Sequence, residues 1–227
     1  MNYNLYLKYE LDLNLDINAD SGSLRKTIFA DIMHQKRTAV ANAKDDEPER
    51  TRIGFVHMIH YHQALAMAYG LNMTQFRDIT LSVRSKVLLE LDYTLITQET
   101  IDEVGVVTNP NIIVLVNFGI SAAYRNKGMG EQFLKGLVKQ MKGFCGYIVI
   151  LNSEPVQFAD RTQQNIIYEN QGVALTGLEK DREKAQFKLN AFFQRCGFRS
   201  FKNYENAFIC NVDQVVPDRM MVKHAVN

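Results

Sequence analysis

The sequence predicts an α/β protein built on a mixed, largely antiparallel sheet with helices on both faces. Two observations lead to this fold class. Over positions 3–17 apolar and polar residues alternate, which is the period of a half-exposed strand. In the second half, the continuous apolar runs at 112–116 and 146–151 alternate with amphipathic helices, as expected for strands covered on both sides.

The first half of the chain is predicted to contain strands joined by polar turns. The stretch 24–35 fits either a returning strand or a helix, and we favour the strand because a meander needs no crossover. The remaining elements expected in this half are a strand at 3–17, a turn at 20–23, a charged loop at 44–52, a strand at 53–61, a short helix at 63–69 ended by Gly70, and a helix at 74–97.

The second half is predicted to alternate between strands and helices before a closing hairpin. Asn109 and Pro110 break the chain ahead of the first buried strand. The expected elements are strands at 111–120 and 146–151, a helix at 131–141 between them, a polar stretch at 153–180, a final helix with Ala185, Leu189, Phe192 and Cys196 on one face, ended by Gly197, and a hairpin of 199–204 with 207–213.

Composition narrows the classes of function. The 227 residues suit one domain, and a formal charge of +1 with interspersed acids and bases gives no field that favours nucleic acid. No apolar stretch approaches the ~20 residues of a membrane span. Cys145, Cys196 and Cys210 are odd in number and far apart, which is typical of reduced thiols. We therefore expect a soluble cytoplasmic protein.

The segment Arg125-Asn126-Lys127-Gly128-Met129-Gly130 reads R-x-x-G-x-G and lies between a predicted strand and a predicted helix. Glycines let the backbone approach phosphate oxygens, and the free N–H groups and dipole of a helix start favour negative charge. Arg125 and Lys127 add positive charge. The spacing is neither that of a P-loop nor that of the dinucleotide fingerprint. It predicts a socket for a pyrophosphate.

This segment resembles motif A of the GNAT superfamily of acyl-CoA-dependent N-acyltransferases, [RQ]-x-x-G-x-[GA] after a strand. Residues 146–158 (GYIVILNSEPVQF) look like the strand that opens the cofactor cleft of the family. Residues 190–198 (NAFFQRCGF) are similar to its final helix and F-Y-x-x-x-G-F ending. The resemblance implies a single GNAT-like domain over 1–227, with a variable N-terminal half (1–104), a cofactor-binding core (105–213) and a peripheral tail (214–227).

The resemblance also implies an activity. Acetyl-CoA would lie between the strands at 111–120 and 146–152, with its pyrophosphate on the backbone N–H groups of 126–130 and its pantetheine arm near 118–120. A neutral primary amine would attack the thioester directly. Small amines, amino-acid derivatives and protein N-termini all remain open as acceptors. The implied cofactor-binding residues are Phe118, Gly119, Ile120, Arg125, Asn126, Lys127, Gly128, Met129, Gly130, Asn152 and Phe193.

One position departs from the pattern of the family. The tyrosine that often serves as its general acid is replaced by Phe193, so the sequence names no catalytic residue. Two further hypotheses follow. One is a non-catalytic GNAT domain that binds CoA; the other is an interaction protein with a closed cleft. In the second case the edge strand at 3–17 would pair with a partner or with a second copy in a homodimer.

Other titratable residues are weighed against their structural roles. His57, His60 and His62 suggest a metal site, but no cysteine or carboxylate clusters with them, so we expect strand histidines and no metal. Tyr168 and Tyr204 are phenols with only their residue type to support a role. Cys145 and Cys196 have apolar surroundings typical of buried thiols.

Overall fold

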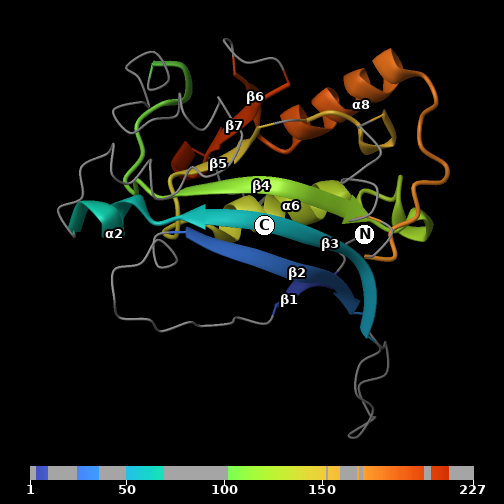
Figure 1. The fold of residues 1–227 in the computed structure, drawn as a ribbon, viewed down its shortest axis with the longest axis horizontal. Coiled ribbons are helices and arrows are strands. Elements are labelled where there is room, and N and C mark those ends of the chain that lie inside the picture. The colour runs from blue at the N-terminus through green and yellow to red at the C-terminus, as the bar shows by residue number, and fades with distance from the viewer. Residues whose placement is uncertain are drawn as a thin grey trace, which may run out of the picture.

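A seven-stranded sheet organises the part of the chain that the computed structural model describes, which comprises residues 4–9, 25–35, 50–68, 102–151, 153–158, 168, 171–201 and 206–214. Its strands follow the order β1-β2-β3-β4-β5-β7-β6 (Figure 1). Only β4 and β5 are parallel neighbours, and the other pairs are antiparallel. The strands are β1 Asn4–Tyr9, β2 Arg25–Gln35, β3 Arg50–Tyr61, β4 Ile112–Ile120, β5 Tyr147–Ile150, β6 Arg199–Ser200 and β7 Phe208–Asn211. The predicted mixed, largely antiparallel sheet is confirmed.

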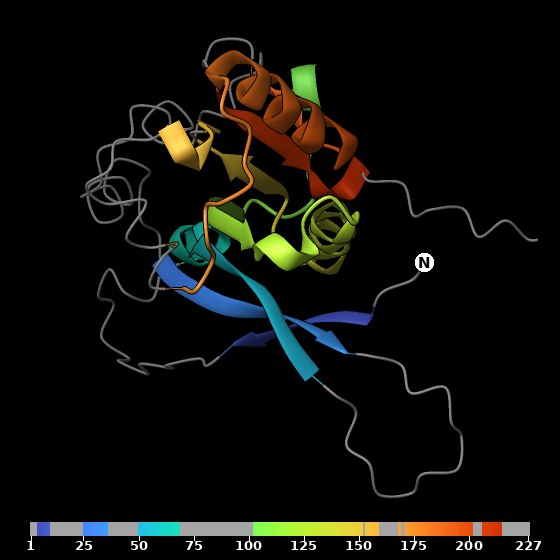
Figure 2. The same ribbon diagram turned by 90° about the vertical axis from the view of Figure 1, so that its right-hand side faces the viewer.

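The N-terminal meander settles the ambiguity at 24–35 in favour of a strand. β2 pairs with β1 on one side and with β3 on the other, so both edges of its backbone are satisfied. Ala30 and Ile32 are buried in the core, in line with their alternate spacing. Figure 2 shows β1 and β2 at the end of the sheet opposite α8. The predicted strand at 3–17 is observed as β1 over 4–9. Its remainder, the turn at 20–23 and the helix at 74–97 lie outside the described residues.

Helices lie on both faces of the sheet. Phe133 and Leu137 of α6 share a core cluster with Leu115 of β4, and Phe193 of α8 belongs to the same cluster. Leu65 of α2 packs against the cluster on the opposite face of β4 and β5. No described helix combines the length and apolar character needed to cross a membrane. The helices are α2 Gln63–Ala68, α6 Met129–Gln140 and α8 Arg182–Arg195, with 3-10 turns η1 Ala122–Tyr124, η2 Val156–Phe158 and η3 Val212–Gln214.

Several element ends differ from the predicted ones. β3 begins at Arg50 inside the predicted loop, because Arg52 forms an ion pair with Asp31 of β2 at 2.6 Å. α6 begins two residues early because Gly128, in the left-handed region with φ 77°, precedes the helix as its N-cap. The hairpin strands are shorter than predicted, and residues 212–214 form η3. Residues 202–205 of the predicted hairpin lie outside the described residues.

Candidate functional site

The parallel strands β4 and β5 separate part-way along their length. Their pairing covers only residues 112–114 and 147–149, whereas β4 continues to Ile120 beside β3. The register between β3 and β4 skips Val116, which is therefore a bulge residue and is 40% exposed. A bulge bends a strand and increases its twist. Beyond residue 114, the described part of the chain supplies no strand partner on the β5 side of β4.

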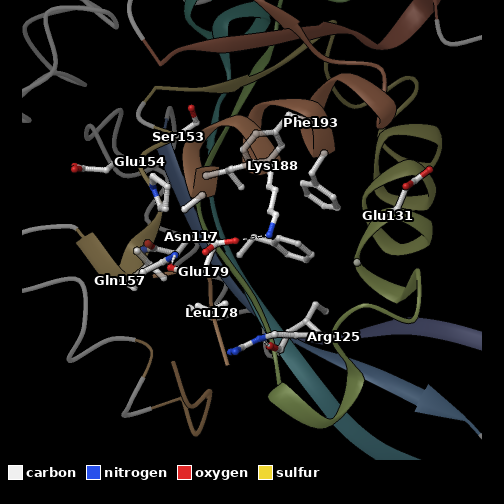
Figure 3. Close-up of a pocket in the computed structure, with 18 of the residues that line it drawn as sticks. Asn117, Arg125, Glu131, Ser153, Glu154, Gln157, Leu178, Glu179, Lys188 and Phe193 are labelled. Atoms are coloured by element: carbon white, nitrogen blue, oxygen red, sulfur yellow. Dashed lines mark hydrogen bonds and ion pairs between the residues drawn. The ribbon is translucent and has the colours of Figure 1, made fainter. Parts of the chain in front are cut away.

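A cavity of about 510 Å³ lies in this gap. It is bounded by β4, by the turn after β4, by the start of α6, by one face of α8, and by the segments 153–157 and 177–179 (Figure 3). The opening between the strands is therefore not filled by side chains. Seven of the predicted cofactor-binding residues line the cavity: Phe118, Ile120, Arg125, Asn126, Gly128, Gly130 and Phe193.

The turn from β4 into α6 has an unusual backbone. Asn126 and Gly128 have φ of 59° and 77°, a region that asparagine tolerates and glycine adopts without cost. A Cβ on Gly128 would meet nothing within 4 Å, so backbone conformation and not crowding calls for glycine here. The first hydrogen bond of α6 runs from Gln132 N to Gly128 O at 3.0 Å. Within the described residues, the N–H groups of 126–131 donate to no protein acceptor, which leaves a row of donors beside the cavity.

Arg125 holds two segments of the chain together. Its Nε donates to Ile120 O at 2.8 Å, its Nη1 donates to Thr176 O at 2.8 Å, and its Nη2 donates to Ala174 O. Burial lowers the pKa of Arg125, but a guanidinium stays protonated in proteins. All three nitrogens of its guanidinium therefore donate to carbonyls, which ties the end of β4 to the segment 174–176. The positive charge of the motif beside the cavity is therefore already engaged in a structural role.

Four predicted residues do not line the cavity or are not described: Gly119, Lys127, Met129 and Asn152. The ammonium of Lys127 lies 5.7 Å from the ring centroid of Tyr124, a cation–π distance, and Lys127 is absent from the lining. Met129 is buried in the core at 4% exposure. Asn152 lies outside the described residues.

Tyr168 and Gly119 pack together on the opposite face of β4. A Cβ on Gly119 would lie 2.8 Å from the ring of Phe55 and 3.0 Å from that of Tyr168, so the glycine makes room for both rings. The hydroxyl of Tyr168 donates to Phe118 O at 3.3 Å, and Tyr168 lines the cavity. Burial raises the pKa of Tyr168 to about 12, so the phenol stays protonated at neutral pH. In the sequence, only the residue type of Tyr168 indicates a functional role.

Aromatic rings connect β4 with both large helices. The ring of Phe118 stacks with the ring of Phe133, at a centroid distance of 5.5 Å, and with the ring of Phe192, at a centroid distance of 6.2 Å. Phe193 is buried and its ring lies 5.4 Å from that of Phe208. Phe118, Phe192 and Phe193 all line the cavity. Phe193 is therefore an apolar part of the cavity wall.

Charged residues at the cavity form ion pairs. The lining contains three cations and three carboxylates, so its formal charges cancel. Lys188 extends from α8 toward Glu179 and pairs with it at 2.5 Å (Figure 3), and Arg195 pairs with Glu131 of α6 at 3.2 Å. Sequence reasoning missed both cations, although Lys188, Phe192 and Arg195 recur at helical spacing on the face of α8 that carries Ala185 and Leu189.

The described histidines and cysteines lie mainly in the strands and in the core. Within the described ranges, no three metal-ligating side chains are grouped. The rings of His60 and His62 lie 3.9 Å apart, while His57 stacks on Phe29 on the other face of β3. Burial, together with the nearby imidazole of His62, lowers the pKa of His60 to about 4. Burial also raises the pKa of the three cysteine thiols to about 12, so they carry no thiolate at neutral pH.

Comparisons of the chain with protein-family models, with curated proteins and with solved structures found no match.

Proposed function

We propose that the chain is a GNAT-type N-acyltransferase that transfers an acetyl group from acetyl-CoA to a primary amine. The observation that carries the proposal is the cavity between β4 and β5, which ends at the free N–H groups of residues 126–131. A cavity lined in part by aromatic and aliphatic side chains, with a row of N–H donors at one side, suits a ligand with an extended arm and a diphosphate.

The walls of the cavity offer specific partners to such a ligand. The diphosphate would accept hydrogen bonds from the N–H groups at the start of α6, whose dipole favours negative charge. The arm would lie along the free edge of β4. Phe118 O and Ile120 O each already accept one hydrogen bond, from Tyr168 and Arg125, and a carbonyl oxygen has a second lone pair for a ligand amide.

Direct attack by an amine accounts for the chemistry with few demands on the protein. The C–N bond forms, the C–S bond breaks, and the proton lost by the amine balances the one that the departing thiolate takes up. Phe193 cannot donate that proton. Tyr168 retains its proton with a pKa of about 12 and does not protonate a thiolate whose own pKa is about 8.5. The substrate ammonium or water therefore supplies the proton. Tyr168 acts as the hydrogen-bond donor to Phe118 O.

A second candidate function is binding of CoA without turnover. The observation that favours it is the packing of Phe193, whose buried ring occupies the position of the usual proton donor. A ligand or sensor domain would keep the cavity and the N–H row while lacking a group that assists the departing thiolate.

One experiment separates the two candidates. The purified protein is titrated with acetyl-CoA by calorimetry and then incubated with acetyl-CoA and a broad panel of primary amines, with release of free thiol as the readout. Binding with amine-dependent thiol release supports the acyltransferase. Binding without release from any amine supports the CoA-binding domain. Absence of binding at millimolar acetyl-CoA contradicts both.

A further inference from the structure

The ion pair between Arg195 and Glu131 lies where the two helices border the cavity. Arg195 is the last residue of α8, and Glu131 lies in the first turn of α6, next to Gly130. Both residues line the cavity, and Arg195 Nε lies 3.2 Å from Glu131 Oε2. The pair thus sits beside the N–H row that would hold the phosphates of the ligand.

Arg195 is the cation best placed to change partners. Arg125 has every nitrogen of its guanidinium engaged with a carbonyl. Lys188 pairs with Glu179 at 2.5 Å, on the segment across the cavity from α6. Arg195 is 58% exposed, and only its Nε is engaged in the pair with Glu131. Its terminal nitrogens are therefore directed to no described carboxylate.

Glu131 would keep a partner if Arg195 moved. Its second oxygen, Oε1, lies 2.8 Å from Lys135 Nζ, one helical turn further along α6. Hydrogen bonds from Lys135 and Arg195 lower the pKa of Glu131, so it is ionised at neutral pH. A carboxylate in the first turn stabilises the helix but repels an anion bound at the same end. Release of Arg195 to a phosphate would leave this carboxylate paired with Lys135.

We propose that Arg195 binds a phosphate group of the ligand and that Glu131 weakens this binding by competing for Arg195 and repelling the phosphate. The inference rests on the proposed CoA site and assigns a binding role to two residues that the motif does not include. It gives the two members of one ion pair opposite effects on affinity. A purely structural salt bridge would instead give both substitutions the same sign.

Calorimetric titration with acetyl-CoA tests the pair through R195Q and E131Q. We expect R195Q to weaken binding roughly tenfold, because a charge-assisted hydrogen bond to a phosphate is lost. We expect E131Q to tighten binding about threefold, since a partly exposed repulsion is removed. K184Q is the matched control: Lys184 lies on the same helix and pairs with Asp181 at 3.6 Å, and neither residue lines the cavity, so affinity should stay unchanged.

Two further titrants identify the phosphate. Dephospho-CoA lacks the 3′-phosphate, and acetyl-pantetheine lacks all phosphates. A loss for R195Q with both CoA forms assigns Arg195 to the diphosphate, and a loss with acetyl-CoA alone assigns it to the 3′-phosphate; both support the inference. An equal loss with acetyl-pantetheine, an equal loss in K184Q, or unchanged affinity in R195Q overturns it and leaves the proposed function intact. Failure of the wild-type protein to bind acetyl-CoA overturns both.

Discussion

Replacement of Arg125 by glutamine should reduce the stability of the protein in the absence of any ligand. The guanidinium donates to Ile120 O at the end of β4 and to Ala174 O and Thr176 O on a segment about fifty residues away. The bond to Ile120 is partly buried, and the other two are exposed. A hydrogen bond from a charged group contributes ~1–2 kcal/mol when partly buried and a few tenths when water can replace it. The expected loss is therefore about 2 kcal/mol.

This loss is large enough to measure by two methods. The sequence contains ten tyrosines and no tryptophan, so urea unfolding is best followed by circular dichroism and tyrosine fluorescence. A change of about 2 kcal/mol corresponds to a fall of roughly 4–8 °C in the melting temperature of a chain of this size. Lys127→Gln is the neighbouring control. Its ammonium contacts only the ring of Tyr124 among the described interactions, so its loss should stay below about 0.5 kcal/mol.

The opposite pattern would refute the proposal that Arg125 stabilises the protein by linking the end of β4 to the segment 174–176. If R125Q unfolds at the same urea concentration as the wild type but binds acetyl-CoA far more weakly, Arg125 contacts the ligand and does not hold the segment 174–176. The motif would then act through its arginine as well as through its backbone.

Three further predictions concern single groups. Tyr168→Phe should lower the free energy of unfolding by about 1 kcal/mol, since Phe118 O loses its donor; unchanged urea midpoints would count against that bond. Gly128→Ala should cost about 1 kcal/mol because its φ is 77°, whereas Gly136→Ala, at an exposed and uncrowded site in α6, should stabilise the protein by ~0.5–1 kcal/mol; equal effects of the two would contradict the backbone assignment. His60 has a pKa of about 4 when folded and about 6.5 when unfolded, so the unfolded chain binds more protons between these values and stability falls as the pH drops through this window. His60 alone accounts for about 2 kcal/mol of the stability lost from pH 7 to pH 5, so urea unfolding of His60→Gln should show a loss smaller than that of the wild type by about this amount, while His57 and His62, whose pKa values burial also lowers, account for part of the rest.

Local sequence patterns predicted most of the described strands and helices. The core strands and helices around residues 112–150 were predictable because apolar runs and helical spacing report burial directly. The stretch 24–35 fitted two periods, and only pairing with β1 and β3 decides between them. Arg50 to Arg52 read as a loop because the sequence does not reveal that Arg52 would meet Asp31, twenty-one residues away.

The candidate site was predictable in its backbone and not in its side-chain partners. The R-x-x-G-x-G spacing located the turn and the free N–H groups at the start of the helix, which depend on neighbouring residues, but it did not predict the left-handed backbone of Asn126. Two acceptors of Arg125, Ala174 O and Thr176 O, lie in a polar stretch without periodicity. The sequence therefore suggested a charge beside a phosphate, whereas in the structure the guanidinium is bound to backbone carbonyls. Tyr168 and the α8 cations reach the cavity through contacts distant in sequence, which a single motif does not encode.

The proposed function requires that the cavity between β4 and β5 bind acetyl-CoA at the start of α6. The most direct test is the melting temperature of the wild type, Gly130→Asp and Gly136→Asp with and without acetyl-CoA. A Cβ at Gly130 makes only ordinary contacts of 3.6 Å, so the new carboxylate adds negative charge at the cavity with little crowding, while Gly136 is exposed on the same helix.

Ligand at ~100 times its dissociation constant adds about 2.7 kcal/mol, which corresponds to roughly 5–10 °C for this chain. We expect this shift in the wild type and in Gly136→Asp, and its loss in Gly130→Asp. No shift in the wild type at millimolar acetyl-CoA, or an equal shift in both variants, would contradict it.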